Sequence, residues 1–172
     1  MFMYRPTYRR IAELPLAERV AQMRLPEIRA AILAESPVSV DRRDIAEVLS
    51  NIFAHTMGVT FPITHPVDYE PHPSASVRSQ AKQMGKDPVE HMYDLLLADE
   101  GMALYMILSS NYVAGDLEVC REMMLHPNTV TGNGDSGAHV NFISDCSVTT
   151  FHLSHWTRDR SRGDVLPIEL MV

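Results

Sequence analysis

The sequence has 172 residues, 45% of them hydrophobic, which is enough to bury one core. The 22 acidic residues outnumber the 15 basic ones and give a formal net charge of -7. Because no basic run is interleaved with aromatic residues, binding to nucleic acid or to an anionic membrane is disfavoured, and a small-molecule partner is favoured. Cys120 and Cys146 have no CxxC spacing, and we find no secretion signal or membrane-spanning run, so we expect a cytoplasmic protein.

The apolar pattern in the N-terminal third of the sequence predicts helices. Apolar residues recur at helical spacing over 16–23, Pro26 interrupts the pattern, and the same spacing resumes over 28–32. A five-member apolar stripe over 45–53 predicts a further helix. We therefore expect residues 1–58 to form a helical segment.

A proline-rich stretch follows. Residues 59–76 contain four prolines, each of which removes a backbone donor, so an extended surface loop is expected. Asp87 then precedes Pro88 and Glu90, which places a capping acid, a proline and a second acid at the start of a helix. This pattern predicts a helix that begins at Pro88.

The second half of the chain predicts a strand, a helix and a strand. Residues 102–108 form a continuous apolar run that is typical of a buried parallel strand. A helix is expected from Gly115 to Met124, and a short strand over 129–132. In barrels built of such units the chemistry lies on the loops that follow the strands. Helical patterns over 148–155 and 166–172 complete the chain.

The glycine-rich turn at 132–137 contains the first candidate site residue. Glycines let a ligand or a metal approach the backbone closely, so Asp135 among them is a candidate catalytic carboxylate. His139 follows four residues later and can face the same cavity as a metal ligand, a proton relay or a substrate donor. The structural alternatives stay open: the aspartate can cap its own turn, and the histidine can be bonded into that turn.

The polar loop that follows the predicted strand 102–108, and a charged run near the C-terminus, offer further candidates. Asn111 and Tyr112 can bond a bound acyl group through an amide and a phenol, although asparagine at the end of a strand is also a common turn former. The charged residues at 158–162 can attract a substrate carboxylate, but such a run favours a solvated helix end.

His152 and His155 are three residues apart and lack the glutamate and the spacing of the zinc-protease motif. Three-apart histidines without a third ligand hold zinc poorly. We therefore predict that they lie on a helix face packed with Phe151 and Trp156.

Taken together, several phrases resemble the final segment of metal-dependent amidohydrolases of the N-acyl-D-amino-acid deacylase (D-aminoacylase) type. They are His126-Pro127, Gly134-Asp135-Ser136-Gly137-Ala138-His139, Asp145 and His155-Trp156-Thr157-Arg158-Asp159. Leu14 to Val20, Asp68 to Pro71, Asp87-Pro88 and Asn111-Tyr112 fall in the order that this family shows, so the resemblance spans nearly the whole chain.

The resemblance implies a fold and a chemistry. It implies an α/β fold, the C-terminal portion of a TIM-like (β/α)8 amidohydrolase barrel, with residues 77–172 as its last strand-helix units and an inserted helical segment. Asp135 matches the family's aspartate, a zinc ligand that passes a proton from metal-bound water to the departing amine. His139, Asn111 and Tyr112 would bind the substrate, and the implied reaction is hydrolysis of the amide bond of N-acyl-D-amino acids.

Two departures from the family pattern limit this expectation. Ser136 stands where the family commonly has glycine, and the sequence contains no His-Xaa-His pair, the source of the family's other ligands. One aspartate does not hold a catalytic zinc, so we expect the isolated chain to be a fragment that neither binds zinc tightly nor hydrolyses acyl-amino acids. The alternative is a non-catalytic helical binding or assembly protein that completes a barrel with a separately encoded N-terminal chain.

Overall fold

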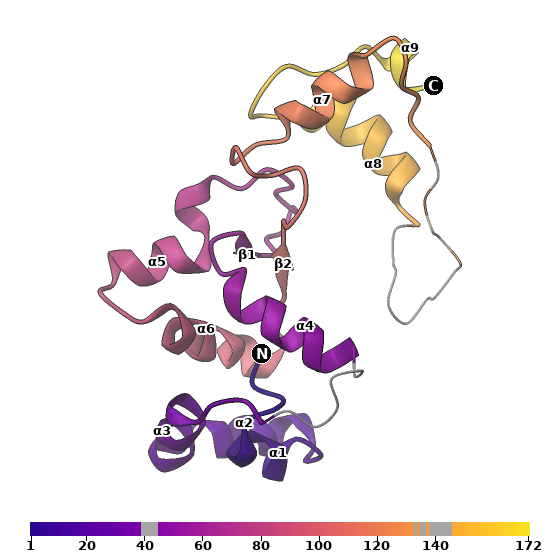
Figure 1. The fold of residues 1–172 in the computed structure, drawn as a ribbon. Helices are drawn as coiled ribbons and strands as arrows, with labels where there is room; N and C mark the ends of the chain where they lie inside the picture. The colour runs from indigo at the N-terminus through magenta and orange to yellow at the C-terminus, as the bar shows by residue number, and fades with distance from the viewer. Residues whose placement is uncertain (39–44, 133, 135–136, 138–145) are drawn as a thin grey trace. The chain divides into compact units, whose positions relative to one another are not determined.

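The computed structural model describes residues 1–38, 45–132, 134, 137 and 146–172. The chain divides into two compact units, Met1–Ser110 and Asn111–Val172 (Figure 1). We describe each unit by itself and call them unit 1 and unit 2.

Unit 1 is built mainly of helices. Its elements are α1 (Pro6–Ile11), α2 (Leu16–Met23), α3 (Pro26–Ala34), α4 (Ile45–His55), β1 (Thr60–Pro62), the 3-10 turn η1 (Pro73–Ala75), α5 (Val77–Gln83), α6 (Pro88–Leu96), the 3-10 turn η2 (Ala98–Gly101) and β2 (Tyr105–Ile107). The helices predicted over 16–23, 28–32 and 45–53 are confirmed as α2, α3 and α4.

The start of α6 follows the predicted capping pattern. The side chain of Asp87 accepts hydrogen bonds from the backbone N–H groups of Val89 (2.8 Å) and Glu90 (3.2 Å). Pro88 occupies the first helical position, where its missing N–H costs no intrahelical bond. Local chemistry therefore fixes this helix end.

The core of unit 1 gathers around Tyr93. This residue is fully buried, its ring meets Phe2 edge to face at 5.2 Å, and its hydroxyl donates to the carbonyl oxygen of Met23 at 2.8 Å. Ile11 and Ile32 complete the cluster. The bond from Tyr93 satisfies the one polar atom that this aromatic side chain brings into the core.

The TIM-barrel prediction is wrong for the residues that the structure describes. β2 pairs with β1 in an antiparallel sheet of two strands, with Phe61 opposite Met106. A barrel portion requires parallel strands joined by crossover helices. Only Tyr105–Ile107 of the predicted 102–108 strand is extended, and Met102 and Leu104 are 62% and 67% exposed. The run is apolar but not buried on both faces.

The proline-rich stretch is less irregular than predicted, because it contains β1 and η1. Pro62 is the last residue of β1, a position where a missing backbone donor is tolerated. The strand continues the antiparallel pairing through a bond from Ile63 N–H to the carbonyl of Leu104 at 2.9 Å. The prolines therefore shorten this strand rather than abolish it.

Unit 2 contains α7 (Glu118–Leu125), α8 (Val148–Ser154), a turn of π-helix termed η3 (His155–Asp159) and the short α9 (Ile168–Met171). α7 confirms the predicted helix that ends at Met124 within one residue. Residues 129–132 are not a strand, which removes the second strand on which the barrel prediction rested. Among the described helices, none is long and apolar enough to cross a membrane.

Candidate functional site

The glycine-rich turn lies partly outside the described residues. Asp135, His139 and Asp145 are among the undescribed positions, so the structure says nothing of their geometry. Gly137 has a φ of +88°, and no atom of the described residues lies within 4 Å of the position where a Cβ would stand. The backbone angle by itself favours glycine at this position.

Asn111 and Tyr112 are adjacent in sequence but differ in environment. Asn111 is exposed and adopts the left-handed conformation with a φ of 58°, as a turn-forming asparagine does. Tyr112 is buried, and its phenol oxygen accepts a hydrogen bond from Arg162 at 3.0 Å. Arg162 also donates to the carbonyl of Gly115 at 2.7 Å. Through these two bonds the arginine holds the loop that contains Asn111 and Tyr112, the two residues predicted to bind substrate.

Arg160 is the organising residue of unit 2. Its side chain is 0% exposed, and its guanidinium lies 5.0 Å from the centre of the Trp156 ring. It forms an ion pair with Glu118 at 3.1 Å and donates to the carbonyl of Asp164 at 2.9 Å. The prediction of a solvated charge run is therefore wrong at this position, because an aromatic face, a carboxylate and carbonyls replace water around the cation.

Gly163 makes room for this arrangement. A Cβ at Gly163 would lie 2.6 Å from a terminal nitrogen of Arg160, and the residue has a φ of +140°. Both the space and the backbone angle require glycine. The signals in the sequence were the four-residue spacing of Trp156 and Arg160, which brings two side chains together on a helix, and the glycine that follows.

Glu118 joins both arginines of this network. It accepts from Arg121 at 2.7 Å as well as from Arg160. Desolvation acts to raise the pKa of Glu118, but the hydrogen bonds and charges of Arg160 and Arg121 outweigh it and hold that pKa below its usual value. Glu118 is thus an ionised structural carboxylate and not a proton donor at neutral pH.

The prediction for His155 is confirmed. Its ring stacks on Phe151 at 4.8 Å and meets Trp156 edge to face at 5.3 Å, and the residue is buried. The backbone N–H of Arg160 donates to the carbonyl of His155 at 2.9 Å, which is the i to i+5 pattern of a π-helix. Such turns often occur at functional sites, and here the turn sets the direction in which Arg160 leaves the helix.

His152 has a different environment, because it lines an open hollow of about 340 Å³ in unit 2. The other lining residues are Cys120, Met123, Met124, Thr129, Val130 and Thr131. Thr131 directly precedes the glycine-rich turn, so the hollow lies where the chain enters that turn. Cys120 and Met124 are four residues apart on α7, so both side chains line the hollow from the same side of that helix.

The donor groups for zinc are incomplete. Among the residues that the structure describes, no group of three histidine, cysteine, aspartate or glutamate side chains is placed to hold a metal ion. The predicted ligand Asp135 lies outside those residues. A catalytic zinc needs about three protein ligands, so the described residues do not fit this metal by themselves.

Comparisons with protein-family models, with curated proteins and with solved structures found no match to this chain.

Proposed function

We propose that this chain takes part in metal-dependent hydrolysis of the amide bond of N-acyl-amino acids, with the D series as the expected substrates. The observation that supports this proposal most is the phrase Gly134-Asp135-Ser136-Gly137-Ala138-His139 between His126-Pro127 and His155 to Asp159. The proposal concerns the chemistry and not a barrel fold, which the antiparallel sheet overturns.

In this proposal Asp135 moves the proton. An amide is a poor substrate because its nitrogen must be protonated before it leaves. A carboxylate held close to the scissile bond accepts a proton from the attacking water and delivers it to the departing nitrogen, which is general base and then general acid catalysis. His139, four residues after Asp135 in the sequence, donates to the substrate and fixes its position.

Asn111 and Tyr112 have separate roles in the proposal. The exposed amide of Asn111 contacts the acyl group or the carboxylate of the substrate. The buried phenol of Tyr112 already accepts from Arg162, so Tyr112 serves as a positioning residue that sets the course of the loop. Substitution of Tyr112 by phenylalanine should then change KM through the loop, with a small effect on kcat.

The metal requires ligands beyond this chain. The sequence has no His-Xaa-His pair, and the described residues do not supply a zinc site. We therefore propose that a second polypeptide, carrying the histidines, assembles with this chain. When bound, the zinc would lower the pKa of its water and polarise the amide carbonyl.

A reconstitution experiment tests the proposal. The chain is produced alone and together with the polypeptide encoded immediately upstream, each with added zinc, and release of acetate from N-acetyl-D-leucine is measured. The proposal predicts turnover and bound zinc only in the combined preparation. Asp135→Asn should abolish turnover, whereas Asp159→Asn, which removes an exposed carboxylate paired with Arg158, should not.

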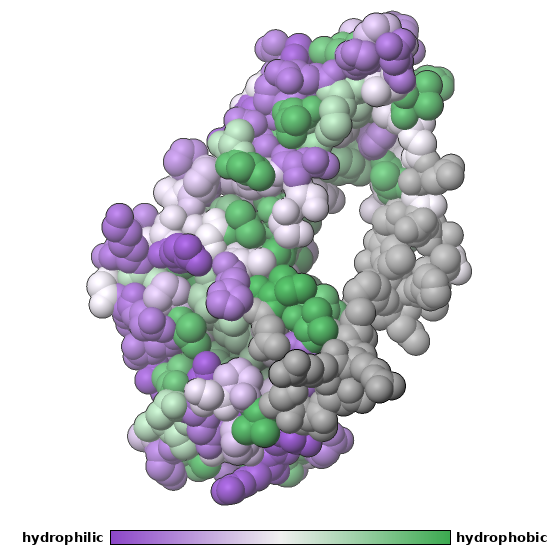
Figure 2. All heavy atoms as spheres, viewed as in Figure 1, coloured by the Kyte–Doolittle hydropathy of each residue, from purple (hydrophilic) through white to green (hydrophobic). Residues whose placement is uncertain are grey.

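A second candidate function has support of its own. Val48, Ile52 and Phe53 on α4 are substantially exposed, and Figure 2 shows hydrophobic residues at the surface over this helix. A groove of about 280 Å³ beside them is lined by apolar side chains that include Phe53, Met92 and Leu104. Exposed apolar surface of this kind favours association with another protein. A non-catalytic assembly protein would have the same surface.

The two candidates differ in one measurement. If the chain only assembles, the combined preparation forms a complex, and Asp135→Asn leaves any hydrolysis of N-acetyl-D-leucine unchanged. If the chain takes part in catalysis, the same variant forms the complex but loses the hydrolysis.

A further inference from the structure

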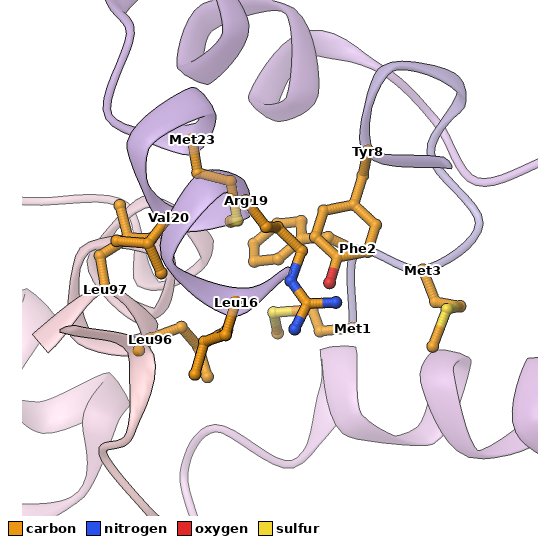
Figure 3. A pocket seen from close by; sticks show the side chains of 11 residues that line it. Met1, Phe2, Met3, Tyr8, Leu16, Arg19, Val20, Met23, Leu96 and Leu97 are labelled. Atoms are coloured by element: carbon orange, nitrogen blue, oxygen red, sulfur yellow. The ribbon is translucent and has the colours of Figure 1, made fainter. Parts of the chain in front are cut away.

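A cavity of about 210 Å³ lies in unit 1 beside α2. Its walls come from three parts of the chain: the N-terminal residues, α2 and the segment that joins α6 to η2. Figure 3 shows the side chains of Phe2, Val20, Met23 and Leu97 around it. Phe2, Val20 and Met23 are buried, so this part of the wall is apolar and fixed by the core.

Two polar groups enter this apolar space. In Figure 3 the guanidinium group of Arg19 and the phenol oxygen of Tyr8 both project into the region that the apolar side chains enclose. Arg19 donates to the carbonyl of Ala12 at 2.7 Å through one nitrogen. A guanidinium carries five N–H donors, so further donors are available to a ligand.

Arg19 differs in its charge balance from Arg29 and Arg121, two other partly buried arginines. Arg29 is neutralised by Glu90 and Asp94, and Arg121 by Glu118. For Arg19, no ion pair with an aspartate or a glutamate exists within the part of the chain that the structure describes. A cation beside an apolar wall, without a protein carboxylate, is a binding group for an anion.

The volume limits what the cavity can hold. Drug-sized ligands occupy pockets of about 300 to 1,000 Å³. An apolar cavity of about 150 Å³ accepts one benzene ring. The 210 Å³ here therefore suits one ring, or a short alkyl chain, with a small polar group attached.

From these observations we infer that this cavity is a binding site for small monocarboxylates with one apolar ring or short chain. The apolar part lies against Phe2, Val20 and Leu97, and the carboxylate accepts hydrogen bonds from Arg19 and from the hydroxyl of Tyr8. These residues have no part in the proposed amide hydrolysis, and the inference does not rest on that proposal.

Calorimetric titration of the full chain with sodium phenylacetate tests this inference, with 2-phenylethanol as the neutral analogue of the same ring. The expected result is saturable binding of one phenylacetate per chain, and binding of 2-phenylethanol at least about tenfold weaker, because a charge-assisted contact is lost. This comparison uses the unaltered protein, so its result does not depend on the folding of a variant.

Variants locate the site. Arg19→Met should weaken phenylacetate binding by about tenfold or more, Arg19→Lys should restore part of it, and Tyr8→Phe should weaken it to a lesser extent. Arg9→Met, which removes an exposed arginine of α1, is the matched control and should bind as the unaltered chain does. Circular dichroism verifies that each variant is folded.

Three results would overturn the inference. These are the absence of saturable phenylacetate binding, equal binding of phenylacetate and 2-phenylethanol, and equal weakening by Arg19→Met and Arg9→Met. The last would assign the effect to net charge and not to this cavity. None of these results bears on hydrolysis of N-acetyl-D-leucine, so failure here leaves the proposed function standing.

Discussion

Replacement of Arg160 by methionine should destabilise unit 2 strongly. The substitution keeps a long apolar side chain but removes the ion pair with Glu118, the bonds to the carbonyls of Asp164 and Arg162, and the contact with Trp156. The carbonyls of Asp164 and Arg162 are only partly buried, so each lost bond costs about 1 kcal/mol, and a desolvated cation–π contact is worth roughly 1 to 2 kcal/mol. Glu118 keeps Arg121 as a partner, so we expect a total loss of about 3 kcal/mol.

The protein supplies its own probe for this experiment. Trp156 is the single tryptophan of the chain and contacts Arg160 directly, so its fluorescence reports the unfolding of unit 2. With a urea slope of about 1 to 1.5 kcal/mol/M, the loss moves the midpoint down by about 2 to 3 M. Arg158→Met is the control, because Arg158 is 74% exposed and its ion-pair partner among the described residues is its exposed neighbour Asp159. Equal midpoints for the two variants would refute the structural role of Arg160.

Three further predictions concern unit 1. Tyr93→Phe should lower the free energy of unfolding by about 1 to 2 kcal/mol in urea titrations, because it leaves the carbonyl of Met23 without its donor. Burial raises the pKa of Tyr93 to about 12. The stabilisation that the protonated phenol contributes is therefore complete below the unfolded pKa near 10 and is lost as the pH rises towards 12. A free energy of unfolding of the unaltered chain that stays constant over this pH range would contradict this prediction. Hydrogen bonds from the side chain and backbone of Thr7 hold the pKa of Glu35 below its usual value. The stability that these bonds give the folded chain is therefore present above the unfolded pKa of Glu35 and is lost as the pH falls through its lowered, folded pKa. Thr7→Val should therefore make acid unfolding, followed by circular dichroism, less steep. Asp87→Ala should reduce thermal stability by about 1 kcal/mol through loss of the cap on α6, whereas Asp87→Asn, which still caps, should have a much smaller effect.

Helices with local start signals were predicted well, because the chemistry that begins them lies within a few residues. Asp87 and Pro88 define the start of α6 without reference to the rest of the chain. The pattern over 16–23 likewise places Val20 and Met23 on the buried face of α2. These features depend on the spacing of residues along the sequence, so they can be predicted from the sequence.

The sheet could not be predicted in the same way. A run of apolar residues such as 102–108 has no period, so it does not reveal which partner it pairs with or which face is covered. Its partner is β1, in a segment where prolines argued against a strand. Pairing between segments more than forty residues apart depends on the whole fold, and the expectation of parallel strands failed at that step.

The environment of the charged residues at 158–162 could not be predicted from composition either. Arg158 and Arg160 belong to the same short run, yet one is exposed and the other is enclosed by Trp156, Glu118 and backbone carbonyls. What separates them is the π-helical turn η3, which shifts the face on which each residue emerges. The positions of Asp135 and His139 lie outside the described residues, so their predicted roles stay predictions.

The most direct measurement of the proposed chemistry is the rate of N-acetyl-D-leucine hydrolysis by the zinc-loaded assembly containing either Asp135 or Asp135→Asn. We expect Asp135→Asn to lower kcat by about 100-fold or more, because a proton-transfer group is removed, and to leave the assembly intact. Equal rates for the two assemblies would show that this carboxylate takes no part in amide cleavage and would contradict the proposed function.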